Sequence, residues 1–130
     1  MKLLLDTHVF VWASTDDPQL GGMARELITD PANPLLVSAA SAWEMSIKAA
    51  SGKWPAADTM IDGIHDAIHA LGASTLPIEI EHAVRAGRLD WAHRDPFDRM
   101  LAAQAICEGA TLVTADRAFE ASGARLIRPA

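Results

Sequence analysis

Short apolar runs alternate along this chain with longer segments of helical periodicity, and this order constrains the fold more than any other feature. The apolar runs lack two-residue alternation, which favours strands buried on both faces of a parallel sheet. The pattern therefore predicts an α/β protein, a three-layer α/β/α sandwich with a central, mostly parallel sheet. The predicted strands are residues 2–5, 35–37, 75–78, 112–113 and 125–127, and the predicted helices are residues 20–29, 39–50, 56–71, 80–89 and 96–108.

The length and composition limit how the chain is organised. Its 130 residues fit one domain, 1–130, and half of them are apolar, which suffices for a sizeable core. The apolar run at 3–5 is too short for a signal peptide or a membrane span. Cys107 is the single cysteine, so an intramolecular disulfide is excluded and the cytoplasm is the expected location.

The charge balance is acidic. The chain has 17 Asp and Glu against 11 Lys and Arg, giving a formal net charge of -6. This balance argues against a broad basic surface that would hold nucleic acid nonspecifically. An acidic excess also arises where several carboxylates share a metal site, because the bound cations are not counted in the formal charge. Charge alone leaves both interpretations open.

Four acidic residues stand where a parallel sheet would gather them. Asp6 directly follows the first predicted strand, and Asp116 follows the fourth. Glu44 and Asp98 lie in the first turns of the helices that begin near 39 and 96. Ligands of open α/β sheets bind in the crevice beyond the carboxyl ends of the strands. These four side chains are therefore candidates for one shared site.

Each of these acids also has a simpler structural explanation when it is considered alone. A strand-end Asp such as Asp6 or Asp116 often caps the following helix. Glu44 fits a capping box with Ser41, and Asp98 is a favourable charge near a positive helix end. Asp95 is assigned to capping of the helix that starts at Pro96.

The four acids considered together indicate a metal site and not four separate helix caps. Carboxylates that converge in a low-dielectric cleft repel each other strongly unless cations compensate them. Oxygen ligands suit Mg²⁺, which is usually held by a few carboxylates, waters and substrate phosphate oxygens. The indicated chemistry is phosphodiester hydrolysis, in which a metal ion activates water and stabilises the leaving 3′ oxygen.

Four sequence blocks occur in an order and at separations that resemble PIN-domain proteins of the VapC type, the ribonuclease toxins of bacterial type II toxin–antitoxin systems. The blocks are LLDTH at 4–8, VSAASAWE at 37–44, HRDPFDRML at 93–101 and TLVTAD at 111–116. The resemblance covers nearly the whole chain, and the ordered set of blocks is specific.

This resemblance implies an α/β/α sandwich and an endoribonuclease that depends on Mg²⁺ or Mn²⁺. The acidic quartet of the family carries over to Asp6, Glu44, Asp98 and Asp116, as catalytic residues and metal ligands. Thr114 matches a polar residue of the family that could orient a ligand or a water molecule. The resemblance also implies a homodimer and a VapB-like antitoxin whose C-terminal segment blocks the acidic site.

Several neighbouring side chains have open roles at this stage. His93 could approach the scissile phosphate or simply be exposed in its loop. Arg99 could pair with phosphate or balance the charge of Asp95. Trp12, Trp43, Trp54 and Trp91 could each stack on a base. Trp43 stands at core spacing and is expected to pack inside, whereas Trp54 and Trp91 lie in loops and stay open.

Two other functions compete with an RNA-cleaving enzyme. Asp6 after a strand resembles the nucleophile of haloacid-dehalogenase-like phosphatases, but those enzymes carry a second Asp where this chain has His8. The alternative is a non-catalytic α/β module that binds a protein and uses the acids only as helix caps. Metal-dependent cleavage of RNA would exclude the binding module.

Overall fold

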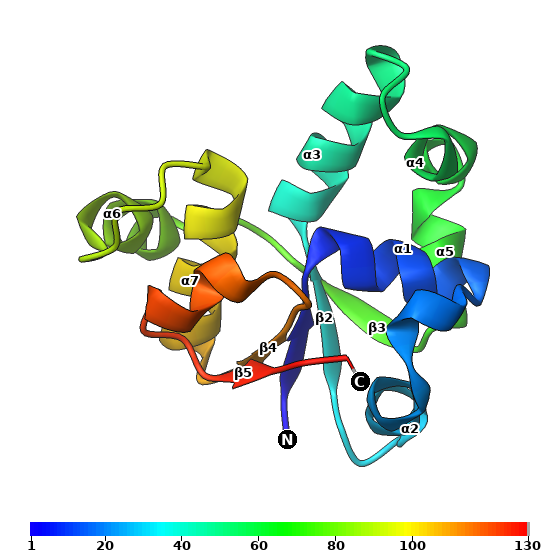
Figure 1. The fold of residues 1–130 in the computed structure, drawn as a ribbon, viewed down its shortest axis with the longest axis horizontal. Helices are drawn as coiled ribbons and strands as arrows, with labels where there is room; N and C mark the ends of the chain where they lie inside the picture. The colour runs from blue at the N-terminus through cyan, green and yellow to red at the C-terminus, as the bar shows by residue number, and fades with distance from the viewer. Residues whose placement is uncertain (130) are drawn as a thin grey trace.

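The computed structural model describes residues 1–129, and its centre is a five-stranded sheet with helices on both sides (Figure 1). All neighbouring strands pair in parallel, in the order β3-β2-β1-β4-β5. The predicted α/β class and the central parallel sheet are therefore confirmed. The strands are β1 (Leu3–Leu5), β2 (Leu35–Ser38), β3 (Ala73–Leu76), β4 (Thr111–Val113) and β5 (Leu126–Ile127).

The helices differ from the sequence prediction at two clear points. The helix over Thr7–Thr15 was not among the predicted helices. The predicted helix over 56–71 is wrong as a single element, because the Gly63 N–H bonds to the Met60 carbonyl (3.1 Å) and the chain turns there. No helix within residues 1–129 is long and apolar enough to cross a bilayer. The helices are α1 (Thr7–Thr15), α2 (Gly22–Thr29), α3 (Ala39–Ala50), α4 (Pro55–Ile61), α5 (Ile64–Ala70), α6 (Ile80–Arg88) and α7 (Pro96–Glu108), with short 3-10 helices η1 (Pro18–Leu20) and η2 (Arg117–Ala121).

The core lies in two layers, one on each face of the sheet. Successive side chains of a strand point to opposite faces. Leu3 and Leu5 of β1 accordingly pack in one cluster with α1, α2 and α4, while Leu4 packs in the other with α7. The three leucines are fully buried, as expected for a central strand covered on both faces.

The chain order creates a crevice at one end of β1. From β1 the chain adds β2 and β3 on one side, then returns to place β4 on the other side of β1. In such sheets the ligand site lies beyond the carboxyl ends of the strands, where the strand order reverses. The Asp6 N–H bonds to the Val113 carbonyl (3.0 Å), so the segments that leave β1 and β4 begin side by side.

Candidate active site

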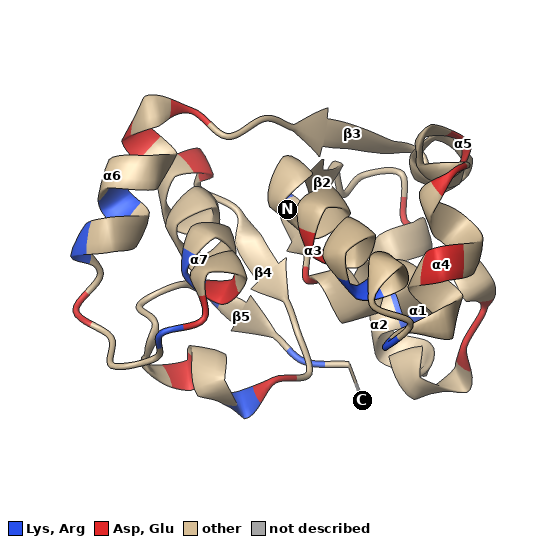
Figure 2. Cartoon of the chain, turned by 90° about the horizontal axis from the view of Figure 1, so that it is seen from above, with Lys and Arg blue, Asp and Glu red and all other residues tan. Residues whose placement is uncertain are grey.

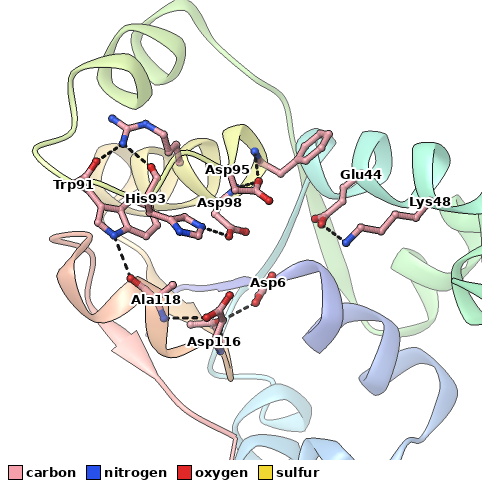
Figure 3. A network of polar contacts seen from close by, with 12 residues as sticks. Asp6, Glu44, Lys48, Trp91, His93, Asp95, Asp98, Asp116 and Ala118 are labelled. Carbon is pink, nitrogen blue, oxygen red and sulfur yellow. Dashed lines mark hydrogen bonds and ion pairs between the residues drawn. The ribbon is translucent and has the colours of Figure 1, made fainter. Parts of the chain in front are cut away.

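A cavity of about 330 Å³ opens beyond the ends of β1 and β4. One wall comes from α1 and α3, and the other comes from the start of α7 and the segment after β4 (Figure 3). The cavity brings together the four predicted acids and adds a fifth, so its lining includes the carboxylates of Asp6, Glu44, Asp95, Asp98 and Asp116.

Asp6 is buried at the base of this cavity, with 6% of its surface exposed. It precedes α1, but its side chain makes no capping hydrogen bond. Instead, the Thr114 hydroxyl donates to Asp6 Oδ2 (2.6 Å) and accepts a bond from the Asp116 N–H (3.1 Å). Burial raises the pKa of Asp6, and the Thr114 bond opposes that shift only in part. Helix capping therefore does not explain Asp6.

Glu44 points into the cavity from α3. The helix begins at Ala39 with Ser38 as its N-cap, whose hydroxyl accepts a bond from the Ala40 N–H (3.0 Å). The predicted capping box between Ser41 and Glu44 is therefore wrong, because the helix starts three residues earlier than that box requires. The buried Glu44 carboxylate pairs instead with Lys48 Nζ at 2.8 Å.

Asp98 lies in the first turn of α7, opposite Glu44 (Figure 3). Its Oδ2 lies 2.6 Å from His93 Nε2. The pKa of Asp98 is raised to about 6, chiefly by burial; the hydrogen bond from His93 opposes this shift, and the charges of Asp95 and Asp6 add to it. Asp95 accepts bonds from the N–H groups of Phe97 (2.8 Å) and Asp98 (3.1 Å), which confirms its predicted role as the cap of α7.

Asp116 has both a structural role and a place in the cavity. Its Oδ1 accepts a hydrogen bond from the Ala118 N–H (2.9 Å), which caps η2. The side chain is exposed and also lines the cavity. A capping role and a ligand role are compatible here, because a carboxylate can accept several bonds through its two oxygens.

The raised pKa of Asp98 predicts that the stability of the protein depends on pH when a chelator removes divalent cations. A carboxyl with a raised pKa holds its proton in the folded protein over a pH range where the unfolded chain has lost it. Stability should therefore fall as pH rises from about 4, the ordinary Asp value, through about 6, the value for Asp98. Urea unfolding of the wild type and Asp98→Asn in EDTA would measure this. If the difference in unfolding free energy between the two proteins did not change with pH, the raised pKa of Asp98 would be contradicted.

Arg99 points away from the cavity and holds the loop that precedes α7. Its Nε and Nη2 donate to the carbonyls of Ala86 (3.0 Å) and Leu89 (2.9 Å), and Nη1 donates to those of Trp91 (2.6 Å) and His93 (3.0 Å). The expected contact with phosphate or with the Asp95 charge is therefore not what the structure shows. The guanidinium thus makes four hydrogen bonds to backbone oxygens, from five N–H donors.

Replacing Arg99 with Met should lower the unfolding free energy by about 2–4 kcal/mol, because several hydrogen bonds to a charged donor are lost at once. Arg99→Lys should restore little, since an ammonium cannot reproduce the planar fork of donors. Urea denaturation would measure the effect, with the exposed Arg94→Met as the matched control. Equal stability of the two Met variants would show that the loop does not depend on Arg99.

His93 belongs to the same loop and is held by Trp91. The two rings stack with centroids 4.7 Å apart, and Trp91 Nε1 donates to the Ala118 carbonyl (3.1 Å). The structure thus places His93 as a partner of Asp98, and Trp91 is engaged in packing and hydrogen bonding (Figure 3).

The opposite wall holds His8, Trp12 and Lys48. Of these, the sequence pointed only to Trp12, as a side chain that could stack on a base, and it missed the other two. Two of them were detectable in principle, since His8 follows Asp6 by two residues and Lys48 follows Glu44 by one helical turn. The prediction that Trp43 packs inside is wrong: it is 58% exposed, and its ring meets that of Phe97 in a T-shaped arrangement, at 4.8 Å between centroids.

The donor set of the cavity fits a hard divalent cation. It offers carboxylate oxygens, and burial raises the pKa of Asp6 and Asp98, so the charged forms of these two groups are disfavoured in the absence of a cation. Lys48 is the one Lys or Arg among the residues that line the cavity, and Lys and Arg positions are otherwise spread over several elements (Figure 2). The space among the carboxylates suits Mg²⁺, which keeps several waters.

A tighter group of potential ligands lies elsewhere, at Glu81, His82 and Glu108, with ligand atoms within 4.8 Å of one another. The Glu79 N–H donates to His82 Nδ1 (2.9 Å), so Nε2 carries the proton and donates to Glu108 (2.9 Å). Both ring nitrogens are used. This group caps α6 and links it to α7, and it does not offer a free imidazole lone pair.

The family model of the PIN domain matches residues 3–123, and the chain therefore belongs to the PIN domain family. It is similar to ribonuclease VapC16 of Mycobacterium tuberculosis (strain ATCC 25618 / H37Rv), with 36% identity over 64 residues. That match covers 49% of this chain and 44% of the relative, less than half of the relative's length.

Solved structures with the same fold include toxin–antitoxin proteins. The chain superposes on VapBC2 from Rickettsia felis, solved with a promoter DNA fragment, with a TM-score of 0.71, 19% identity and 98% coverage of both chains. For FitAcB from Neisseria gonorrhoeae the TM-score is 0.68, with 20% identity and coverage of 98% of this chain and 97% of that one. For VapBC-5 from M. tuberculosis the TM-score is 0.62, with 18% identity and coverage of 98% and 96%.

Proposed function

We propose that this chain is a Mg²⁺- or Mn²⁺-dependent endoribonuclease that acts as the toxin of a toxin–antitoxin pair. The observation that carries the proposal is the gathering of Asp6, Glu44, Asp98 and Asp116 in one cavity at the reversal point of the sheet, in a PIN-domain chain. The similarity to a ribonuclease supports RNA as the substrate.

The four acids have distinct roles in this proposal. Asp6, Glu44 and Asp98 hold the cation directly, and Asp116 holds it directly or through water. When bound, the cation supplies the positive charge that activates a water molecule and stabilises the leaving 3′ oxygen. Thr114 orients the Asp6 carboxylate through its 2.6 Å hydrogen bond.

His93 orients Asp98 in the corresponding way, through a contact of 2.6 Å. A hydrogen bond to one oxygen of each carboxylate leaves the remaining lone pairs to face the cavity. The two positioning contacts come from different elements, the end of β4 and the loop before α7. Each contact therefore fixes the orientation of one carboxylate.

We also propose that the partner is a VapB-like antitoxin protein. The solved structures of similar fold are named as VapBC and FitAB assemblies, which supports this choice. An acidic cavity of this kind suits a basic segment of the antitoxin as an inhibitor. A homodimer, a cytoplasmic location and a single domain over 1–130 complete the proposal.

Total cellular RNA tests the proposal most directly. Purified protein without antitoxin would be incubated with the RNA in Mg²⁺ or Mn²⁺, with EDTA as a control, and new ends would be mapped by sequencing. The expected result is a set of discrete cuts that EDTA abolishes. An absence of cuts by folded protein would favour the non-catalytic binding module instead.

A further inference from the structure

The wall of the cavity formed by α1 and α3 differs from the acidic wall opposite it. It carries Lys48, the one Lys or Arg that lines the cavity, together with the rings of His8 and Trp12. The proposed chemistry of the acids uses none of these three groups. Their joint presence beside the carboxylates calls for a separate explanation.

Lys48 is placed between two partners. Its Nζ lies 2.8 Å from Glu44 Oε2 and 5.3 Å from the centroid of the Trp54 ring. The side chain is 37% exposed, so its long stem has room to move. A cation bound by Glu44 would compete with Lys48 for the same carboxylate, which leaves the ammonium free to take an anionic partner in the cavity.

His8 provides a flat surface in the same wall of the cavity, and its ring and the Lys48 ammonium both approach Trp54. Its ring stacks on Trp54 with centroids 4.4 Å apart and an interplanar angle of 24°, and it meets Trp12 edge-on at 6.1 Å. His8 is exposed and lines the cavity, whereas Trp54 lies behind it and packs against the core. The His8 ring is therefore held in place from behind and open to the cavity.

We propose that Lys48 and His8 form the substrate-positioning wall of the site. Lys48 binds a backbone phosphate next to the scissile bond, and the His8 ring, supported by Trp54, stacks with the adjacent base. A phosphate-binding cation beside an aromatic platform is the usual arrangement for single-stranded nucleic acid, because an unpaired base exposes its ring face. The inference rests on the proposed function and deepens it by naming the side chains that position the RNA.

A binding experiment separates this wall from the chemistry. The probe is a fluorescently labelled, mixed-sequence single-stranded RNA of about 12 nucleotides, titrated in Ca²⁺ while a denaturing gel verifies that the RNA stays intact. The variants are Lys48→Met, His8→Ala and His8→Phe. The matched controls are Lys53→Met and His69→Ala, which change exposed residues outside the cavity lining.

His8→Ala should weaken binding by about 5- to 100-fold, and His8→Phe should restore most of it because stacking needs only a ring. Lys48→Met should weaken binding and reduce the slope of log K against log salt by about 0.7, the loss of one phosphate contact to a single strand. Both controls should bind as the wild type does. A hairpin of the same composition should bind less tightly than the single strand.

The opposite outcomes overturn the proposal. If Lys48→Met changes only the affinity for Mn²⁺, measured by calorimetry, then Lys48 is merely the counter-ion of Glu44. If His8→Ala binds as tightly as the wild type, the platform is not used. If the wild-type protein cuts total RNA but these variants bind RNA normally, the proposed nuclease function is retained and the proposed role of Lys48 and His8 is refuted. If the wild-type protein neither cuts nor binds RNA, both proposals are refuted.

Discussion

Asp6→Asn is expected to lower RNA cleavage by at least about 10³-fold, the loss typical when a central charge at the reacting centre is removed. Asp6 and Glu44 are the two most buried acids of the cavity. Asp6 lies at the point where β1 and β4 end side by side. Asparagine keeps its size and can still accept the Thr114 bond, but it removes the negative charge. Sequencing of cleaved ends in total RNA would measure the loss.

The same substitution should leave the fold as stable as the wild type, or more stable, when divalent cations are absent. The pKa of Asp6 is raised by burial, so the charged carboxylate is destabilised in the metal-free folded protein. Asp66→Asn on the exposed face of α5 is the matched control for a lost Asp charge. Undiminished cleavage by a folded Asp6→Asn protein would refute the assignment of the site.

The second large effect is expected for the response of stability to metal. A ligand that binds only the folded state adds about 2.7 kcal/mol at 100 times its Kd. For a chain of this length that corresponds to a rise in Tm of about 10 °C. Asp98→Asn should lose most of this rise with Mg²⁺ or Mn²⁺, because one carboxylate ligand is gone. Differential scanning fluorimetry with and without the metal would measure the two shifts.

Asp66→Asn again provides the comparison, since it changes the net charge equally at a distance from the cavity. It should show the full rise of the wild type. Equal shifts in Asp98→Asn and the wild type would mean that Asp98 is not a ligand. The loss of RNA cleavage in Asp6→Asn would then have to be explained without a metal shared between the two residues.

The strands were predictable because their apolar runs are short and bounded by turn residues. All five predicted strands appear, with ends shifted by a residue or two, as for β3 at Ala73–Leu76. Helix α1 was harder, because Val9, Phe10 and Val11 form a continuous apolar run without helical periodicity. Its burial under the sheet, where an all-round apolar helix is favourable, is a tertiary effect that local pattern does not report.

The site was predictable where topology alone decides position. Asp6 and Asp116 follow adjacent strand ends, so the parallel sheet brings them together. Glu44 was identified as a candidate and the predicted start of its helix at Ala39 was right, but the predicted capping box was wrong, because the choice between Ser38 and Ser41 as cap depends on tertiary contacts. Ser41 is buried and accepts a bond from the Thr7 hydroxyl (2.9 Å), a contact across 34 positions of sequence.

Side-chain direction was the part that the sequence could not supply. Arg99 lies one position after Asp98, yet it points to the opposite side of α7 from the cavity. Trp43 lies one position before Glu44 and is exposed. In both cases a neighbour in sequence occupies a different face of the helix, and the face that is buried depends on what packs against it.

The anchoring of the loop before α7 has a consequence for how the protein tolerates mutation. Arg99 donates hydrogen bonds to the backbone carbonyls of Leu89, Trp91 and His93 in this loop. A backbone carbonyl is present whichever residue type occupies the position. The loop can therefore change many of its side chains while its path stays fixed, so long as Arg99 remains. A saturation library over 89–94 should consequently contain many stable members at exposed positions such as Ala92 and Arg94, and clearly fewer once position 99 is altered as well.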